Sequence, residues 1–130
     1  MEYIATPMII LILNALMEAA AGLQGILVPE KANKGMFPGY DSGANAHAIT
    51  RAFGTAALSI AFLSAVGAYV ASDPVALMPV LATLIFYNVV IAGVFLWLAS
   101  KGIKNTVATV VHVVIAAILI YYWCALGVTI

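Results

Sequence analysis

The fold of this chain is decided by the stretch VALMPVLATLIFYNVVIAGVFLWLAS, residues 75–100. This stretch contains no charged side chain, and about 20 apolar residues suffice to cross about 30 Å of hydrocarbon. Three further apolar stretches lie at residues 5–28, 46–71 and 105–128. The sequence therefore predicts an all-α, polytopic membrane protein whose four transmembrane helices form a single domain over residues 1–130.

The composition agrees with this prediction and excludes several classes of protein. Of the 130 residues, 65% are hydrophobic and 8% are charged, whereas soluble domains are about half apolar and a quarter charged. The single cysteine, Cys124, excludes a disulfide framework or a metal centre built from cysteines. Five basic and five acidic residues offer no surface for nucleic acid. The expected surroundings are membrane lipids.

The connections between the spans predict how the helices are arranged. Residues 72–74 and 101–104 form connections so short that the helices they join must be antiparallel neighbours. Asp73 and Asn105 precede the third and fourth spans, where their side chains are suited to cap a helix. The longer connection, residues 29–45, is rich in Gly, Pro and turn-forming residues and is expected to be a loop. Either this loop lies at the surface with Met36, Phe37 and Tyr40 in the headgroup region, or it is a flap that closes over the basic-side end of the bundle or docks on a partner. An up-down-up-down bundle follows.

The basic residues predict the orientation of the bundle in the membrane. They all fall on the side of the connections 29–45 and 101–104, and they are Lys31, Lys34, Arg51, Lys101 and Lys104. The opposite side carries only the acids Glu2 and Asp73. By the positive-inside rule, the basic side faces the cytoplasm of a bacterium, or the matrix or stroma of an organelle. Both termini are then expected on the non-cytoplasmic side.

Polar residues inside the spans are the candidates for a site, because an ionisable group in hydrocarbon must face the bundle and find a partner. Asn14 and Glu18 are one turn apart in the first span, and His47 and Arg51 are one turn apart in the second. Each pair continues into a stripe of small residues, at which membrane helices approach closely. We therefore expect these two faces to meet.

Arg51 has two possible positions. Its long side chain can reach inward to pair with Glu18, or it can extend outward to the lipid phosphates. In a buried pair, desolvation would offset much of the Coulomb attraction, so the pair would be satisfied without being strongly stabilising. The sequence leaves both positions open.

His112 and Asn88 are the polar candidates of the fourth and third spans. A lone histidine in a helix bundle is most often a helix-to-helix hydrogen bonder; the alternatives are an axial ligand to haem or chlorophyll and a donor to a quinone carbonyl. His47, at the membrane boundary, is a second and less suited candidate for an axial ligand. Asn88 and Asn14 are expected to form interhelical hydrogen bonds. With Glu18 and Arg51, they make up the candidate ligand-binding cluster, and no metal site is expected.

The sequence contains none of the common catalytic motifs. HExxH, Gly-x-Ser-x-Gly, a phosphate loop and a paired acidic motif for catalytic metals are all absent. The glutamate, arginine and histidines near the spans suffice for a proton relay or for holding a ligand. They favour a non-catalytic role, without excluding an enzyme for a hydrophobic molecule.

Short motifs at the ends of two spans carry a resemblance to a known family. The first span ends in GLQG, residues 22–25, followed by VPE, residues 28–30, and the second contains RAFG, residues 51–54. In these motifs and in its size, the chain resembles the DoxX-like group of four-helix membrane proteins over nearly its whole length. The resemblance implies an accessory membrane subunit associated with quinone-linked oxidoreductases, with Glu18 and Arg51 lining the bundle interior.

Two classes of function fit these observations. In the first, the chain is a small non-catalytic subunit of a larger energy-converting membrane complex, respiratory or photosynthetic, that contacts other membrane protein subunits and lipid, quinone or pigment. In the second, it is a stand-alone DoxX-like binder, carrier or enzyme for a hydrophobic small molecule. A subunit should co-purify with its partners, whereas a stand-alone protein should be stable by itself.

Overall fold

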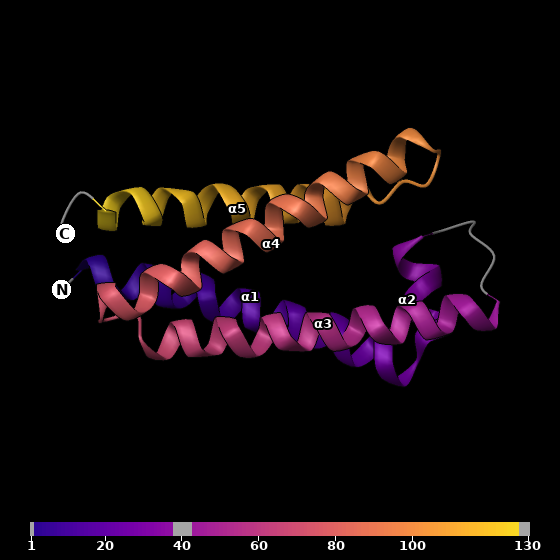
Figure 1. Ribbon diagram of the computed structural model, residues 1–130, viewed down its shortest axis with the longest axis horizontal. Helices are drawn as coiled ribbons and strands as arrows, with labels where there is room; N and C mark the ends of the chain where they lie inside the picture. Colours follow the sequence, from indigo (N-terminus) through magenta and orange to yellow (C-terminus); the bar gives the residue numbers. More distant parts are fainter. Residues whose placement is uncertain (1, 38–42, 128–130) are drawn as a thin grey trace.

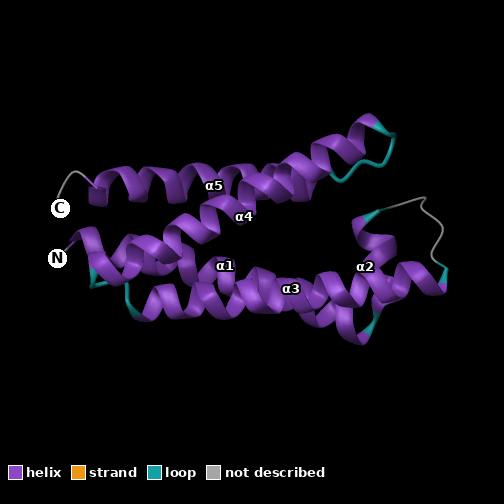
Figure 2. Cartoon of the chain, in the orientation of Figure 1, coloured by secondary structure: helices purple, strands orange, loops and turns teal. Residues whose placement is uncertain are grey.

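Five helices make up the part of the chain that the structure describes. This computed structural model describes residues 2–37 and 43–127 (Figure 1). Its helices are α1 (Glu2–Leu27), α2 (Pro29–Met36), α3 (Ala44–Tyr69), α4 (Pro74–Ser100) and α5 (Thr106–Gly127). The four longer helices are apolar and long enough to cross a membrane. The all-α class and the four spans are thus confirmed (Figure 2), and the chain is an integral membrane protein.

The four long helices run alternately up and down and associate as two pairs. α1 begins and α5 ends at the same end of the molecule, and α2 lies at the other end (Figure 1). α1 packs along α3 and α4 packs along α5, whereas the contacts between the two pairs are far fewer. α4 starts beside the end of α3 and then diverges from it towards the end where α2 lies (Figure 1). The two helix pairs are therefore farther apart at that end.

Glycines bring α1 and α3 into close contact. A Cβ atom placed on Gly54 of α3 would lie 2.7 Å from the carbonyl oxygen of Gly22 on α1. One placed on Gly25 would lie 3.0 Å from Cα of Gly54. Larger side chains at these positions would hold the backbones apart. The small residues of the first two spans therefore meet, as predicted, whereas Glu18 and Arg51, the charged members of the two predicted faces, have other partners.

An apolar core joins the two helix pairs near the end at which α1 begins. Its fully buried members come from α1, α4 and α5, and they are Leu11, Leu77, Leu81, Leu84 and Leu119. The core thus closes one end of the bundle, and α2 covers the other.

The prediction of a loop was wrong for residues 29–36, which form α2. Pro29 occupies the first turn, where its missing N–H costs no hydrogen bond. The Lys34 ammonium donates a hydrogen bond of 2.7 Å to Glu30 one turn away and holds the pKa of that carboxyl below its usual range. The proline and glycine content of this segment favoured a loop, but proline is also common in the first turn of a helix. The rest of the predicted loop includes residues 38–42, which lie outside the described part of the chain.

The two short connections are capped as predicted. The Asp73 carboxylate accepts hydrogen bonds from the backbone N–H groups of Val75 (3.0 Å) and Ala76 (3.2 Å) at the start of α4. Asn105 accepts one of 3.0 Å from the N–H of Ala108 at the start of α5. Both caps satisfy N–H groups that have no partner within the helix.

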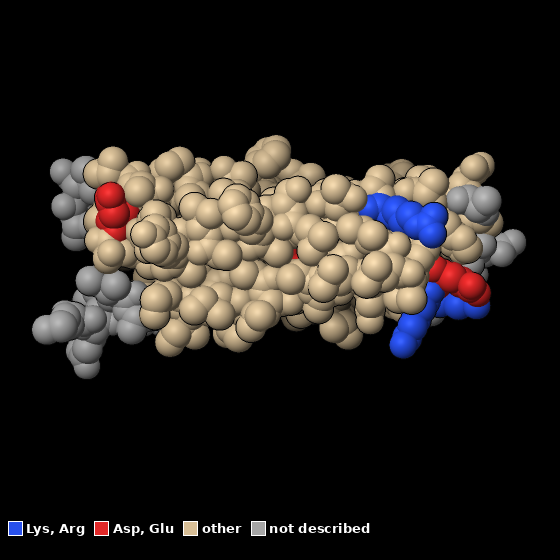
Figure 3. Space-filling view, turned by 90° about the horizontal axis from the view of Figure 1, so that it is seen from below, with Lys and Arg blue, Asp and Glu red and all other residues tan. Residues whose placement is uncertain are grey.

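Charged side chains lie at the ends of the molecule, and its flank is almost free of them (Figure 3). Lys31 and Lys34 belong to α2, and Arg51 lies in the second turn of α3, at the same end. Asp73 lies at the opposite end, between α3 and α4. The Glu2 side chain, the other acid expected there, lies outside the described part of the chain. Basic residues therefore gather at the end that α2 covers.

Candidate ligand-binding site

Glu18 links the two helix pairs. The Tyr87 hydroxyl of α4 donates a hydrogen bond of 3.1 Å to Oε2 of Glu18 on α1. The Glu18 residue is only 3% exposed, and its Oε1 has no hydrogen-bond partner among the described residues. One oxygen of this carboxyl group thus remains open to a further donor.

Arg51 does not pair with Glu18. Its side chain is exposed, and its Nε donates a long hydrogen bond of 3.4 Å to the carbonyl oxygen of Ile26, near the end of α1. Of the two positions that the sequence left open, the structure has the outward one. The guanidinium lies at the basic end of the bundle, where it avoids the desolvation that a buried pair would require.

Asn14 forms an interhelical hydrogen bond, as expected, but within the α1–α3 pair. Its Nδ2 donates to Oγ of Ser64 on α3 at 2.8 Å, and both residues are fully buried. The Ser64 hydroxyl in turn donates to the carbonyl oxygen of Ile60 at 2.9 Å. This bond stabilises the contact between α1 and α3 rather than joining the other candidates.

Asn88 and His112 form the second expected interhelical hydrogen bond, between α4 and α5. His112 Nδ1 lies 2.8 Å from Asn88 Oδ1. Asn88 Nδ2 donates to the carbonyl oxygen of Leu84 at 2.8 Å, so the amide oxygen is the group that faces the histidine. Because that oxygen can only accept, Nδ1 carries the proton and donates.

The other ring nitrogen of His112 is then an acceptor. Nε2 of the neutral ring keeps its lone pair, and no described residue forms a hydrogen bond with it. Donation to a quinone carbonyl, one of the alternatives from the sequence, would need a proton on Nε2, and it stays a prediction. A haem or chlorophyll would bind at the lone pair, and this axial role stays a prediction.

Aromatic rings connect His112 to its surroundings. The ring stacks on Phe95 with centroids 5.9 Å apart and meets Tyr87 edge-on at 6.0 Å. Phe95 in turn lies 6.2 Å from Phe37, just after α2. A continuous row of side chains therefore runs from Glu18 through Tyr87 and His112 to the end of the molecule covered by α2.

His47 lies in different surroundings from His112. It borders an open groove on α2, whose other lining residues are Val28, Pro29, Glu30, Lys31 and Lys34. Its Nε2 is buried and has no hydrogen-bond partner among the described residues. His112 is enclosed instead by rings of α4, so the arrangement does not present the two histidines to one ligand. Within residues 7–37 and 45–127, no three His, Cys, Asp or Glu side chains are grouped to hold a metal ion.

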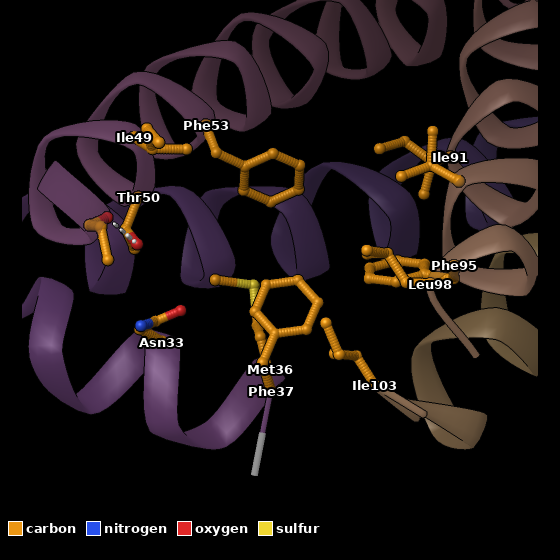
Figure 4. A pocket seen from close by; sticks show the side chains of 12 residues that line it. Asn33, Met36, Phe37, Ile49, Thr50, Phe53, Ile91, Phe95, Leu98 and Ile103 are labelled. Atoms are coloured by element: carbon orange, nitrogen blue, oxygen red, sulfur yellow. Dashed lines mark hydrogen bonds between the residues drawn. The ribbon is translucent and has the colours of Figure 1, made fainter. Parts of the chain in front are cut away.

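An apolar cavity lies where the two helix pairs diverge (Figure 4). Its volume is about 300 Å³, and α2, α3 and α4 surround it. The walls are mostly aliphatic and aromatic, and they include Met36, Phe37, Phe53, Ile91, Phe95 and Ile103. We refer to this space as the α2 cavity.

Two polar side chains share one corner of the α2 cavity (Figure 4). They are Asn33 of α2, which is 4% exposed, and Thr50 of α3, which is 5% exposed. The Thr50 hydroxyl donates to the carbonyl oxygen of Ala46 at 2.8 Å. Asn33 Nδ2 has no hydrogen-bond partner in the described part of the chain. The cavity is thus apolar with one polar corner.

Two contacts hold α2 over the cavity. Asn105 Nδ2, at the start of α5, donates a hydrogen bond of 2.9 Å to the carbonyl oxygen of Met36, the last residue of α2. The rings of Phe37 and Phe95 meet on the cavity wall. Asn105 therefore caps α5 with its oxygen and secures α2 with its nitrogen.

Sequence reasoning singled out the polar residues of the spans and missed the cavity. The described residues that line it include none of the predicted cluster, which is Glu18, Arg51, Asn88, His112 and Asn14. Only His112 adjoins it, through Phe95. The missed residue Asn33 lies in the connection that the sequence predicted to be a loop. A signal was present there, because Glu30 and Lys34 are four residues apart, the spacing at which opposite charges pair on one face of a helix.

The chain was compared with known proteins. No protein-family model, no curated protein and no solved structure matches it. The resemblance to the DoxX-like group therefore remains a prediction.

Proposed function

We propose that this protein binds or carries a small, mostly apolar molecule in the α2 cavity. The observation that carries the proposal is an apolar space of about 300 Å³ between the two helix pairs, covered by a short helix. Its volume is at the lower end of the range of small-molecule sites, about 300–1,000 Å³, and such sites combine apolar walls with a few polar groups.

The polar row beside the cavity has a positioning role in this proposal. The bond between Glu18 and Tyr87 joins the two helix pairs, and the bond between Asn88 and His112 joins α4 to α5. Phe95 contacts His112 on one side and borders the cavity on the other. The first bond ties α4, which forms one wall, to the α1–α3 pair, and the second fixes α4 against α5. The proposal assigns these bonds no chemical step.

Filling the cavity tests this proposal. We expect Ala46→Trp, at a lining position, to abolish binding of diphenylmethane, an apolar probe with two phenyl rings, in equilibrium dialysis of the purified protein in detergent. Ala48→Trp is the matched control, because Ala48 lies on the same helix and is exposed. Equal binding by the wild type and both variants would contradict the proposal, as would the absence of binding to the wild type.

A second candidate function is that of a subunit in a larger energy-converting complex, as the DoxX-like resemblance implies. The observation that favours it is Gly93, an exposed glycine within α4 whose missing Cβ would meet open space. Small residues on the surface of membrane helices permit close contact with another helix. In such a complex, lipid, quinone, chlorophyll or haem would be a neighbouring ligand, and His112 Nε2 is the nitrogen that could serve as an axial ligand.

Extraction in mild detergent separates the two candidates. If the chain is a subunit, it should migrate with a larger coloured or redox-active complex in native size separation, and Gly93→Trp should release it. Migration alone or as a small oligomer would contradict the subunit proposal. It would leave the cavity proposal in place.

We also propose that the basic end of the bundle, with α2, faces the cytoplasm, matrix or stroma. The support is the position of Lys31, Lys34 and Arg51 at this end and of Asp73 at the other, together with the positive-inside rule. The ligand site then lies in the half of the membrane nearer to that compartment.

A further inference from the structure

We propose that the molecule bound in the α2 cavity carries a hydroxyl group that donates a hydrogen bond to Asn33 and Thr50. This inference rests on the proposed function and narrows the ligand to an apolar alcohol or phenol. It is carried by the polar corner of the cavity, whose two side chains both present acceptor oxygens.

Asn33 presents its amide oxygen to the cavity. The side chain lies at the edge of the space with its oxygen directed inward and its nitrogen turned away (Figure 4). The residue is 4% exposed, so bulk water does not surround it. Its buried nitrogen has no hydrogen-bond partner among the described residues. A polar group buried without a partner costs free energy, so a hydrogen bond from a ligand hydroxyl to the amide oxygen would offset part of the cost of burying this side chain.

Thr50 also offers an acceptor. Its hydroxyl hydrogen is engaged by the carbonyl oxygen of Ala46 at 2.8 Å (Figure 4). A hydroxyl that donates to one partner keeps two lone pairs for others. Oγ1 of Thr50 therefore accepts from a ligand and does not donate to it. In the observed orientation of Asn33, both side chains present acceptor oxygens, and the corner is suited to a donor from the ligand.

This preference discriminates among apolar ligands. A ketone, ester or quinone would place its own acceptor oxygen against the acceptor oxygens of Asn33 and Thr50. A pure hydrocarbon would leave both of these oxygens unpaired. An ammonium ion would supply donors, but the described residues that line the cavity carry no charge to balance it. A neutral hydroxyl on an apolar frame satisfies both the corner and the walls.

Three ligands with one carbon frame test the inference. Diphenylmethane has no polar group, diphenylmethanol has a hydroxyl, and benzophenone has only a carbonyl. Each is measured by equilibrium dialysis against the wild type and Asn33→Leu in the same detergent, so that partitioning of the ligand into micelles cancels in the ratio. We expect Asn33→Leu to weaken the binding of diphenylmethanol by about 2- to 10-fold, the usual effect of one hydrogen bond. The binding of diphenylmethane should not change.

Thr50→Val provides a second variant of the same shape. It should also weaken the binding of diphenylmethanol, and it keeps the inference testable if Asn33→Leu fails to fold. Thr55→Val is the matched control, because the Thr55 hydroxyl makes the same type of bond, 3.0 Å to the carbonyl oxygen of Arg51, on an exposed part of α3. It should change the binding of none of the three ligands.

The outcomes separate the inference from the function on which it rests. If benzophenone loses as much affinity as diphenylmethanol, or more, the corner recognises an acceptor and the inference is overturned. If both variants bind all three ligands as the wild type does, the polar corner has no role and the inference is also overturned. If the wild type binds none of the three ligands, the proposed function itself fails.

Discussion

Glu18 has a tyrosine hydroxyl as its partner rather than the guanidinium of Arg51. The sequence identified Glu18 as a buried group in need of a partner, and it is buried. It could not identify the partner, because a span that is apolar on every side leaves the rotation of its helix undetermined. Tyr87 directly precedes Asn88, which the sequence indicated as a buried polar residue. The Tyr87 hydroxyl nevertheless reaches α1. The partner is known only once α4 is placed against α1.

The bond between Tyr87 and Glu18 can be tested by substitution. We expect Tyr87→Phe to lower the free energy of unfolding by about 1–3 kcal/mol, because the Glu18 carboxyl then stays buried without a partner. Combined with Glu18→Leu, the loss should be smaller than the sum of the two single losses. Thermal unfolding in detergent measures this as a double-mutant cycle.

Arg51→Gln is the control for this cycle. The Arg51 side chain is exposed, so its replacement should change the free energy of unfolding by no more than about 0.5 kcal/mol. Strictly additive losses at Tyr87 and Glu18 would refute the bond. So would a loss for Arg51→Gln as large as that for Tyr87→Phe.

At the scale of elements, the sequence predicted the four spans and the two capped connections but not α2. Span length and hydropathy depend on composition alone, and the caps depend on single residues such as Asp73 and Asn105. α2 is short, and its stability depends on contacts with other helices, including the bond from Asn105 to Met36. A short segment of this kind does not form a stable helix by itself. Its own sequence therefore indicates it only weakly.

The close contact of α1 and α3 gives a prediction with an internal control. We expect Gly54→Ala to destabilise the protein by about 1–3 kcal/mol, because the added Cβ would lie 2.7 Å from the backbone oxygen of Gly22. Gly93→Ala, where the Cβ meets open space, should be neutral or stabilising by up to about 1 kcal/mol. Unfolding of both variants in detergent is the measurement. If Gly54→Ala unfolds with the same free energy as the wild type, α1 and α3 lie farther apart than the structure has them.

The contact that holds α2 over the cavity can be removed without removing the cap of α5. In Asn105→Ser, the hydroxyl can still accept a hydrogen bond from the N–H of Ala108. The serine side chain is too short to reach the carbonyl oxygen of Met36. We expect faster amide hydrogen exchange in α2 and unchanged exchange in α5. Asn105→Ala, which removes both bonds, should speed exchange at the start of α5 as well. Unchanged exchange in α2 of the serine variant would show that the bond does not secure it.

At the scale of the whole molecule, the two helix pairs diverge towards the end where α2 lies (Figure 1). The α2 cavity lies between them at that end. Its walls come from three helices and the connection after α4, with lining residues as far apart in the sequence as Asn33 and Ile103. Periodicity within one span carries no information about such a space. The sequence predicted a bundle with an interior polar cluster, whereas the structure has its cavity beside that cluster.

The orientation of the whole molecule is tested by labelling single cysteines. Cys124, the chain's one cysteine, is exposed and is first replaced by alanine. In this background, a membrane-impermeant maleimide should label Ser72→Cys from the non-cytoplasmic side of intact cells or organelles. It should label Lys101→Cys only after the membrane is opened. The reverse pattern would contradict the proposed orientation.

The claim that the α2 cavity holds a small apolar molecule is tested most directly by what the protein retains when it is purified from its own membrane. Organic extracts of the wild type, Ala46→Trp and Ala48→Trp are compared by mass spectrometry. We predict one lipophilic species, near one molecule per chain, that is present with the wild type and Ala48→Trp and lost with Ala46→Trp. Identical extracts from all three proteins would contradict the claim.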